Sequence, residues 1–293
     1  MQIAFHIGAN CTDEDRLLKS TLKNADTLLQ QGIAVPGPGK YRKLIREAID
    51  TLAEGAPTAE ARDVLLDAIV EDDDISRLVL SNDNFITIPK RIFDHSVFYH
   101  QTEKKVRGLH TLFPRDDISL FFGMRHPAGF LQDTATRAGV HSLTHYLGIL
   151  SPVEVLWSDV IRRIKIAAPD TPLYVWCNED TPLIWEELIR LFAGVAPDVP
   201  ITGQYDVLSN IVSPDGMQTL LARIKDISPA DIDARQTLIA EVLEAHALPD
   251  LVEDAITLPE LDDTVVATIT DAYEADLEII AQMDGVELIL PFD

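Results

Sequence analysis

The turn between His6 and Asp15 holds the residues best suited to binding an anion. Before it, the apolar run Gln2–Gly8 predicts a buried strand, and after it the apolar residues recur with helical spacing. Where a parallel strand turns into a helix, backbone N–H groups and the positive end of the helix dipole point outward, and phosphate groups bind there. The candidate anion ligands in this turn are Gly8, Ala9, Asn10 and Thr12.

Three consecutive acids, Asp13, Glu14 and Asp15, stand in the same turn. Two like charges about 5 Å apart repel by roughly 3 kcal/mol at an effective dielectric constant near 20, so one carboxylate directed into the turn offsets a good phosphate contact. The acids also have a structural interpretation. Thr12 can be the helix N-cap with Asp15 as the third helical residue, and all three carboxylates then complement the positive helix end in place of a phosphate.

Arg125 is the second candidate anion ligand. It follows the apolar run Ile118–Met124, which predicts another buried strand, and it stands in the sequence Arg125-His126-Pro127. Ligands of open parallel sheets bind beyond the carboxyl ends of the strands, and a guanidinium there can hold an anion. Arg125 can instead pair with Asp133 at the start of the next helix, and the sequence leaves both interpretations open.

The densest basic cluster of the chain follows a turn at 35–39 that is stiffened by Pro36 and Pro38. Its members are Lys40, Arg42, Lys43 and Arg46. The cluster can fold back over the crevice and accept a carboxylate, a phosphate or an acidic sugar, which makes these four residues candidate substrate ligands. It can equally be the solvated start of a helix. A second group, Lys104, Lys105 and Arg107, predicts an exposed helical face.

Group transfer to a hydroxyl would need a general base that takes the proton of the acceptor. The candidates near the expected crevice are His95, His100, His110 and Asp83, and their spacing singles out none of them. His6 lies within the first strand, where burial in the core is the more common outcome. His141 and His145 are four residues apart without a third ligand nearby, so the sequence predicts no metal site.

The elements that must position these residues alternate between strands and helices. Buried strands are expected at Gln2–Gly8, Arg77–Ser81, Ile118–Met124 and Leu173–Cys177, and helices at 41–53 and 58–70. Helix starts are expected at Ser151-Pro152-Val153-Glu154, which fits a capping box, and at Thr181-Pro182 and Ser228-Pro229. Parallel strands need crossover helices, so this pattern predicts a three-layer α/β sandwich with a mostly parallel sheet.

The last third of the chain is expected to be mostly helical after about Ala193. Five apolar positions there mark one face of a long helix: Val266, Ile269, Tyr273, Leu277 and Ile280. We expect residues 1–293 to form a single α/β domain. Its 46% hydrophobic and 25% charged residues are ordinary for a globular chain and exclude collagen, a disordered tail protein and a small disulfide scaffold.

Several of these segments together resemble the bacterial sulfotransferases that use 3′-phosphoadenosine-5′-phosphosulfate (PAPS), which have a P-loop fold. His6-Ile7-Gly8, Thr12 and the turn 35–39 match the start of that family, and Arg125 with Pro127 matches its Arg-x-Pro motif. Ser81-Asn82-Asp83 is similar to the family's Ser-x-Glu, and Tyr273 and Asp276 are similar to its last helix. The resemblance spans most of the chain.

The resemblance implies transfer of a sulfuryl group from PAPS to a hydroxyl of a small-molecule or carbohydrate acceptor. Arg125 would hold the 3′-phosphate, and the loop from Gly8 to Thr12 would hold the 5′-phosphosulfate. The phosphate loop is degenerate, however, because Cys11 stands in place of the loop lysine, Asp13 in place of the glycine and Asp133 in place of the serine that pairs with the arginine. The alternative function is therefore a non-catalytic binding or interaction protein that has lost the donor.

The net charge of −24 is concentrated in the second half of the chain. Residues 1–150 carry 17 Lys and Arg against 20 Asp and Glu, whereas residues 151–293 carry 7 against 28. Such a surface repels nucleic acid and anionic lipid, so neither is an expected partner. No apolar stretch is long enough to span a bilayer and no secretory signal is evident, which predicts a cytoplasmic protein with reduced Cys11 and Cys177.

The acidic second half predicts that salt stabilises the protein. From Ile227 to Asp293 there are 17 acidic residues and one basic residue, Arg235, so many like charges lie within one Debye length, about 10 Å at 0.1 M salt. Raising sodium chloride from tens of millimolar to about 1 M should screen this repulsion and raise the melting temperature in a calorimetric scan. An unchanged or lower melting temperature would mean that these acids are already paired or far apart.

Overall fold

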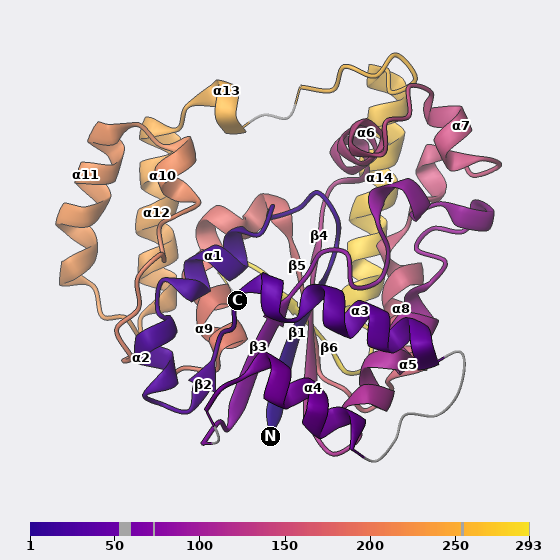
Figure 1. Ribbon diagram of the computed structural model, residues 1–293. Helices are drawn as coiled ribbons and strands as arrows, with labels where there is room; N and C mark the ends of the chain where they lie inside the picture. The colour runs from indigo at the N-terminus through magenta and orange to yellow at the C-terminus, as the bar shows by residue number, and fades with distance from the viewer. Residues whose placement is uncertain (53–59, 73, 253–254, 293) are drawn as a thin grey trace.

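A six-stranded parallel sheet forms the centre of the protein in the computed structural model, which describes residues 1–52, 60–72, 74–252 and 255–292 (Figure 1). Its strand order is β2-β3-β1-β4-β5-β6. The strands are β1 (Gln2–Gly8), β2 (Ile33–Ala34), β3 (Arg77–Ser81), β4 (Asp117–Met124), β5 (Leu173–Cys177) and β6 (Val286–Ile289). All neighbouring pairs are parallel. The predicted α/β class with a mostly parallel sheet is confirmed.

The four predicted strands are all present, and three of them have the predicted bounds. The sequence did not predict the two edge strands. β2 has two residues, and of the four residues of β6 only Ile289 is buried, so neither forms the continuous apolar run that is typical of a central parallel strand. β6 also adds a strand to the largely helical last third of the chain.

Helices cover both faces of the sheet and make two separate cores with it. On one face lie α1 (Arg16–Leu22), α2 (Ala25–Leu29) and α9 (Thr181–Ala193). On the other face lie α3 (Arg42–Thr51), α4 (Ala61–Ile69), α5 (Thr102–Leu112) and α8 (Trp157–Ala167), and α6 (Pro127–Ala138) and α14 (Asp263–Ala281) join the same core. This arrangement is the predicted three-layer sandwich.

The remaining helices form the two upper flanks in Figure 1. α10 (Leu208–Ile211), α11 (Pro214–Arg223) and α12 (Ile232–His246) share a third apolar cluster, with α12 packed on α9. α13 (Pro249–Val252) follows α12, and α7 (Leu143–Leu147) lies beside α6 on the opposite flank. In the part of the chain that the structure describes, no helix is long and apolar enough to cross a bilayer.

Helix starts were predicted less well than strands. The helix expected to begin with Thr12 as N-cap begins at Arg16 instead, and it is interrupted, so that α1 and α2 replace one continuous helix. At Ser151 the expected hydrogen bond forms, since its N–H donates to Glu154 Oε2 at 2.7 Å. It opens only the 3₁₀ turn Pro152–Glu154, and α8 starts at Trp157.

Two other predicted helix starts have different outcomes. Thr181-Pro182 opens α9, whereas Ser228-Pro229 precedes a turn and α12 begins at Ile232. The helices expected at 41–53 and 58–70 are α3 and α4, although residues 53–59 lie outside the described part of the chain. The long helix expected from its apolar face is α14.

The connections of the sheet change direction between β1 and β4, and we call the region beyond the carboxyl ends of these strands the crevice. After β1 the chain runs through α1 and α2 toward β2 on one side, and after β4 it runs through α6, α7 and α8 toward β5 on the other side. Because the two connections leave in opposite directions, they leave a crevice outside the carboxyl ends of these neighbouring strands, where open α/β sheets bind ligands. The turn after β1 and Arg125 after β4 both border it.

Trp157 bonds to the backbone of Arg125 at the end of β4, and its substitution tests the packing of this region. Its ring is fully buried among Phe98, Phe122 and Phe130, and its Nε1 donates a hydrogen bond to the Arg125 carbonyl oxygen at 2.8 Å. Trp157→Ala should lower the free energy of unfolding by about 3–5 kcal/mol in urea titrations. Trp157→Phe should lower it by about 1–3 kcal/mol, because it leaves the carbonyl without its donor. A loss below about 1 kcal/mol for the alanine variant would contradict this packing.

Candidate functional site

The three strand ends expected to form one crevice do converge. The Ala9 N–H donates to the Gly123 carbonyl oxygen at 2.8 Å, which joins the turn after β1 to the end of β4. The Asn10 amide donates to the Asp83 carbonyl oxygen at 3.0 Å and to Asn84 Oδ1 at 3.1 Å, which joins the same turn to the segment after β3. The predicted candidates Gly8, Ala9 and Asn10 therefore lie at the centre of the crevice.

Asn10 has a structural role in this crevice. Its side chain is fully buried, its Oδ1 accepts a hydrogen bond from the Tyr99 hydroxyl at 2.7 Å, and its N–H donates to the same hydroxyl oxygen at 2.9 Å. The Asn10 amide also donates to the Thr87 carbonyl oxygen at 3.2 Å. Because the polar groups of this side chain are bonded within the protein, Asn10 holds the turn in place and does not present a donor to a ligand.

The N-cap residue of the helix that follows the turn is Asp15, not Thr12, and the carboxylate that bonds the helix start belongs to Asp13. The Leu17 N–H in the first turn of α1 donates to Asp13 Oδ2 at 2.9 Å, and Asp13 is only 4% exposed. The Thr12 hydroxyl points back and donates to the Ala9 carbonyl oxygen at 2.8 Å. The prediction of Thr12 as N-cap is therefore wrong, and the predicted position of a carboxylate at the positive helix end is confirmed for Asp13.

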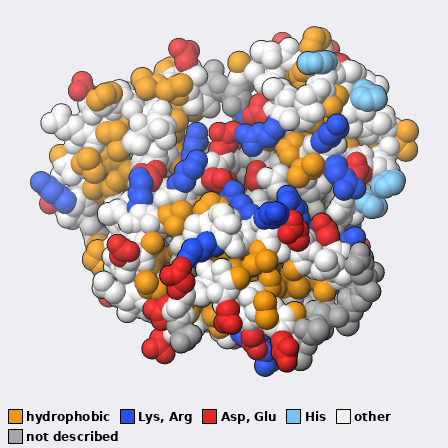
Figure 2. Space-filling view, viewed as in Figure 1, with side chains coloured by type: hydrophobic (Ala, Val, Ile, Leu, Met, Phe, Trp, Pro, Cys, Tyr) orange, Lys and Arg blue, Asp and Glu red, His pale blue; other side chains and the backbone are white. Residues whose placement is uncertain are grey.

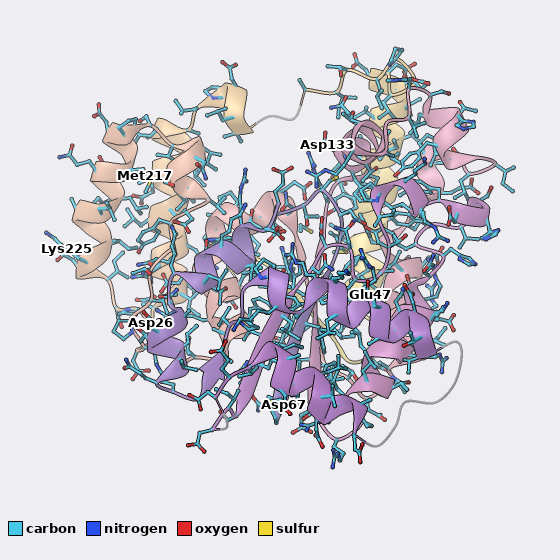
Figure 3. All side chains as sticks on the ribbon, viewed as in Figure 1. Asp26, Glu47, Asp67, Asp133, Met217 and Lys225 are labelled. Atoms are coloured by element: carbon cyan, nitrogen blue, oxygen red, sulfur yellow. The ribbon has the colours of Figure 1, made fainter. Side chains whose placement is uncertain are left out.

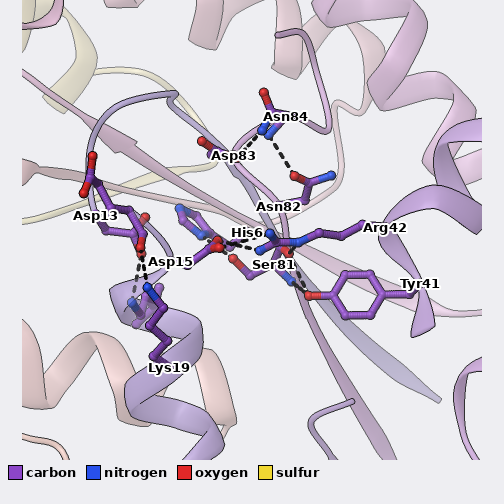
Figure 4. A network of polar contacts seen from close by, with 12 residues as sticks. His6, Asp13, Asp15, Lys19, Tyr41, Arg42, Ser81, Asn82, Asp83 and Asn84 are labelled. Atoms are coloured by element: carbon purple, nitrogen blue, oxygen red, sulfur yellow. Dashed lines mark hydrogen bonds and ion pairs between the residues drawn. The ribbon is translucent and has the colours of Figure 1, made fainter. Parts of the chain in front are cut away.

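Arg42 reaches into the crevice from α3, as the stiff turn before it suggested (Figure 4). Its guanidinium donates to both carboxylate oxygens of Asp15, at 2.5 and 3.1 Å, and its Nε donates to the Ser81 carbonyl oxygen at 2.9 Å. Burial opposes the charge of Asp15, but the hydrogen bonds and the charge of Arg42 lower the pKa of this carboxyl group. The cation that enters the crevice is therefore already paired with a carboxylate of the turn.

Arg125 lies in the crevice and makes the predicted pair with Asp133. Its Nη1 donates to Asp133 Oδ2 at 2.6 Å and to the Cys11 carbonyl oxygen at 2.8 Å, and the residue is 8% exposed. Figure 3 places Asp133 on α6, above the upper ends of the strands. Burial raises the pKa of the Cys11 thiol to about 11, so Cys11 is neutral near pH 7 and supplies no positive charge in place of a lysine.

The other members of the basic cluster do not enter the crevice. Lys40 pairs with Glu71 at 2.7 Å, and Lys43 faces Glu47 at 3.8 Å on the exposed side of α3. Arg46 lines a different pocket, between α3 and α5. Of the four candidate substrate ligands the structure therefore brings Arg42 to the crevice, because Lys40 precedes α3, Lys43 lies on another side of the helix and Arg46 lies one turn further along it.

Of the predicted general bases, Asp83 is the one that lies in the crevice. Burial raises the pKa of its carboxyl group, and the nearby carboxylates of Asp15 and Asp13 raise it further. The rings of His95 and His100 contact each other in a tilted arrangement with centroids 4.7 Å apart, outside the crevice, and His100 lines the pocket that also holds Arg46. His6 is buried as expected and its Nδ1 lies 2.9 Å from Ser81 Oγ.

One further residue of the crevice, Glu179, was missed by the sequence analysis. Glu179 follows β5, and its Oε1 accepts a hydrogen bond from the His126 N–H at 2.7 Å. Burial raises the pKa of the Glu179 carboxyl group. Its position just beyond a predicted buried strand, like that of Arg125 beyond β4, was the signal that could have identified it. The crevice thus contains more carboxylates than the turn alone supplies.

A cavity of about 850 Å³ lies at the opposite, amino ends of the strands, between the sheet, α9 and α12. His110 is the one predicted candidate among its lining residues. Two of its arginines, Arg190 and Arg235, both donate to Glu186, at 2.8 and 2.6 Å. Within the described residues, no group of three or more His, Cys, Asp and Glu could hold a metal ion here or elsewhere.

The hydrogen bond of Asp13 to the start of α1 predicts a loss of stability when its carboxylate is removed. Asp13→Ala should lower the free energy of unfolding by about 1 kcal/mol in urea titrations, because the Leu17 N–H loses its acceptor. The control is Glu14→Ala, which removes an exposed pair with Arg137 and should cost less than about 0.5 kcal/mol. Equal losses in the two variants would contradict this role of Asp13.

The raised pKa of Asp83 predicts a stability effect that depends on pH. An acid whose pKa is higher in the folded state destabilises the fold once the pH exceeds that pKa, and the penalty disappears below its ordinary value of 3.8. Asp83→Asn should therefore raise the free energy of unfolding near pH 7 and change it little near pH 4. Asp67→Asn, on the exposed face of α4, is the matched control for loss of one negative charge. A gain that is the same at both pH values would refute the assignment.

Comparison with known proteins does not assign the chain to a family. No protein-family model matches the chain, and no curated protein matches its sequence. We therefore infer the function from the crevice and the other pockets of the protein.

Proposed function

We propose that this protein is a non-catalytic binding protein with a sulfotransferase-like fold, in which carboxylates have taken the place of the donor phosphates. The contact between the Asp13 carboxylate and the Leu17 N–H carries this proposal. In a phosphate-binding turn, the N–H groups at the helix start and the dipole of the helix face the anion. Here an anionic side chain of the protein itself takes that position.

The two arginines of the crevice support the same conclusion. Arg125 is held by Asp133 and Arg42 by Asp15, both through short charge-assisted hydrogen bonds. A phosphate that approached either guanidinium would have to displace a carboxylate or lie beside it. Two like charges about 5 Å apart repel by roughly 3 kcal/mol at an effective dielectric constant near 20, which offsets the gain from one good phosphate contact.

Sulfuryl transfer from PAPS is the second candidate function. It is favoured by the convergence of the Gly8–Thr12 turn, Arg125 and Asp83 on one crevice. In this reaction Asp83 would accept the proton of an acceptor hydroxyl, which could belong to a carbohydrate or another small molecule, while the sulfuryl group moves in line from donor to acceptor. The candidate lacks a cation for the leaving phosphate, because the neutral thiol of Cys11 stands where the resemblance expects a lysine.

Isothermal titration with adenosine 3′,5′-bisphosphate, the product that a PAPS-dependent enzyme would release, separates the two functions. At the crevice the binding protein should show a Kd weaker than about 1 mM, which corresponds to less than about 4 kcal/mol of binding free energy, so any tighter binding should be independent of Arg125. Arg125→Ala is the matched variant, with circular dichroism to verify that it folds. Micromolar binding that weakens in Arg125→Ala would reject the binding protein and favour the sulfotransferase.

A further inference from the structure

A second pocket, of about 440 Å³, lies between α3, the segment after β3 and the start of α5. α3 contributes Arg46 and Asp50, and the first turn of α5 contributes Lys104 and Lys105. Arg91 comes from the segment between them. The pocket thus combines four cations with one acid, in a chain whose net charge is −24.

Two of these cations are not neutralised by any residue that the structure describes. Lys105 is buried and pairs with Asp50 at 2.7 Å, and Arg91 pairs with Asp94 at 2.7 Å. Arg46 and Lys104 make no ion pair with any of the described residues. Figure 2 shows blue side chains gathered above α3 and toward the right of this face, with pale blue histidines at its right edge. An anion entering the pocket therefore meets two unpaired positive charges.

The neutral groups of the pocket also fit an anionic ligand. Thr87 lines it and is 6% exposed, and the hydroxyl of Thr87 has no hydrogen-bond partner in the protein. This hydroxyl is buried in the wall of the pocket and is not itself presented to a ligand. The amino-terminal turn of the 11-residue helix α5 adds its positive dipole end. Ile86 and Ile88 supply an apolar wall beside these donors.

We propose that this pocket binds the phosphate monoester of a small organic molecule. The phosphate would lie between Arg46 and Lys104 with His100 beside it, and the organic part would pack on Ile86 and Ile88. A phosphate monoester carries about two negative charges at pH 7, which matches the two unpaired cations, whereas a sulfate monoester carries one. This inference rests on the proposed binding function but concerns a site outside the crevice.

Titration of the full-length protein with phenyl phosphate, phenyl sulfate and inorganic phosphate tests the proposal. Phenyl phosphate should bind more tightly than the other two, because it alone has both the double charge and the apolar ring. Arg46→Ala and Lys104→Ala should each weaken its Kd about tenfold or more. Lys43→Ala, on the same helix but paired with Glu47 on the exposed side, is the matched control and should leave the Kd unchanged.

A spectroscopic readout locates the ligand. In ¹H–¹⁵N spectra of the histidine rings, phenyl phosphate should shift His100 and leave His141 unchanged. No binding at millimolar concentration, equal losses in Arg46→Ala and Lys43→Ala, or tighter binding of phenyl sulfate would each overturn the proposal. Adenosine 3′,5′-bisphosphate binding that depends on Arg125, together with phenyl phosphate binding that depends on Arg46, would reject the proposed function and leave this site intact.

Discussion

Arg125 joins more parts of the structure than any other residue of the crevice described above. Its guanidinium holds the Cys11 carbonyl oxygen in the turn after β1 and the Asp133 carboxylate on α6, and its own carbonyl oxygen accepts the indole N–H of Trp157 on α8. A nearly buried cation needs such partners, because its desolvation is otherwise too costly. This requirement ties the first turn, α6 and α8 to the end of β4, and it fixes the shape of the crevice.

The need of buried charges for bonded partners also explains why the crevice offers a ligand little positive charge. Arg42 is half-buried between Asp15 and the Ser81 carbonyl oxygen, and Asp13 is buried against the first turn of α1. Each acid of the turn therefore has a partner that satisfies it inside the protein. Asp83, in the segment after β3, differs from these acids, because burial and the neighbouring carboxylates raise its pKa. The crevice is stable as it stands, and an added anion would compete with contacts that already hold it together.

Helix α3 connects the crevice with the pocket that we propose for a phosphate monoester. Arg42 at its start faces the crevice, and Arg46, one turn later, faces the pocket beside α5. Asn84 belongs to both, because its Oδ1 accepts the amide of Asn10 and it lines the pocket. The difference between the two sites lies in their acids. Carboxylates occupy the first, whereas in the second Asp50 is the one acid among the lining residues and is bonded to Lys105.

The sequence by itself determined the central strands, the helical last third and the burial of His6, because these depend on runs and periodicities of apolar residues that are local in the chain. It also offered the pair of Arg125 and Asp133, eight residues apart across one strand-to-helix junction, as one of two interpretations of Arg125, and the structure contains this pair. The edge strand β6 was missed because it is short and has one buried residue among four, which gives no distinctive pattern. Local rules for helix starts failed at Thr12, because Glu14 and Asp15 have positive φ and α1 begins only at Arg16.

Only the tertiary structure decided which charges remain available. Lys105 was expected on an exposed face and is buried against Asp50, 55 residues away in the chain, and Arg42 found Asp15, 27 residues away. The partner of a long charged side chain depends on how helices pack against one another, and no local pattern encodes that packing. For that reason the sequence identified Arg42, Arg46 and His100 as candidates but not their neighbours. In the packed structure Arg42 lies in the crevice, whereas Arg46 and His100 line one pocket.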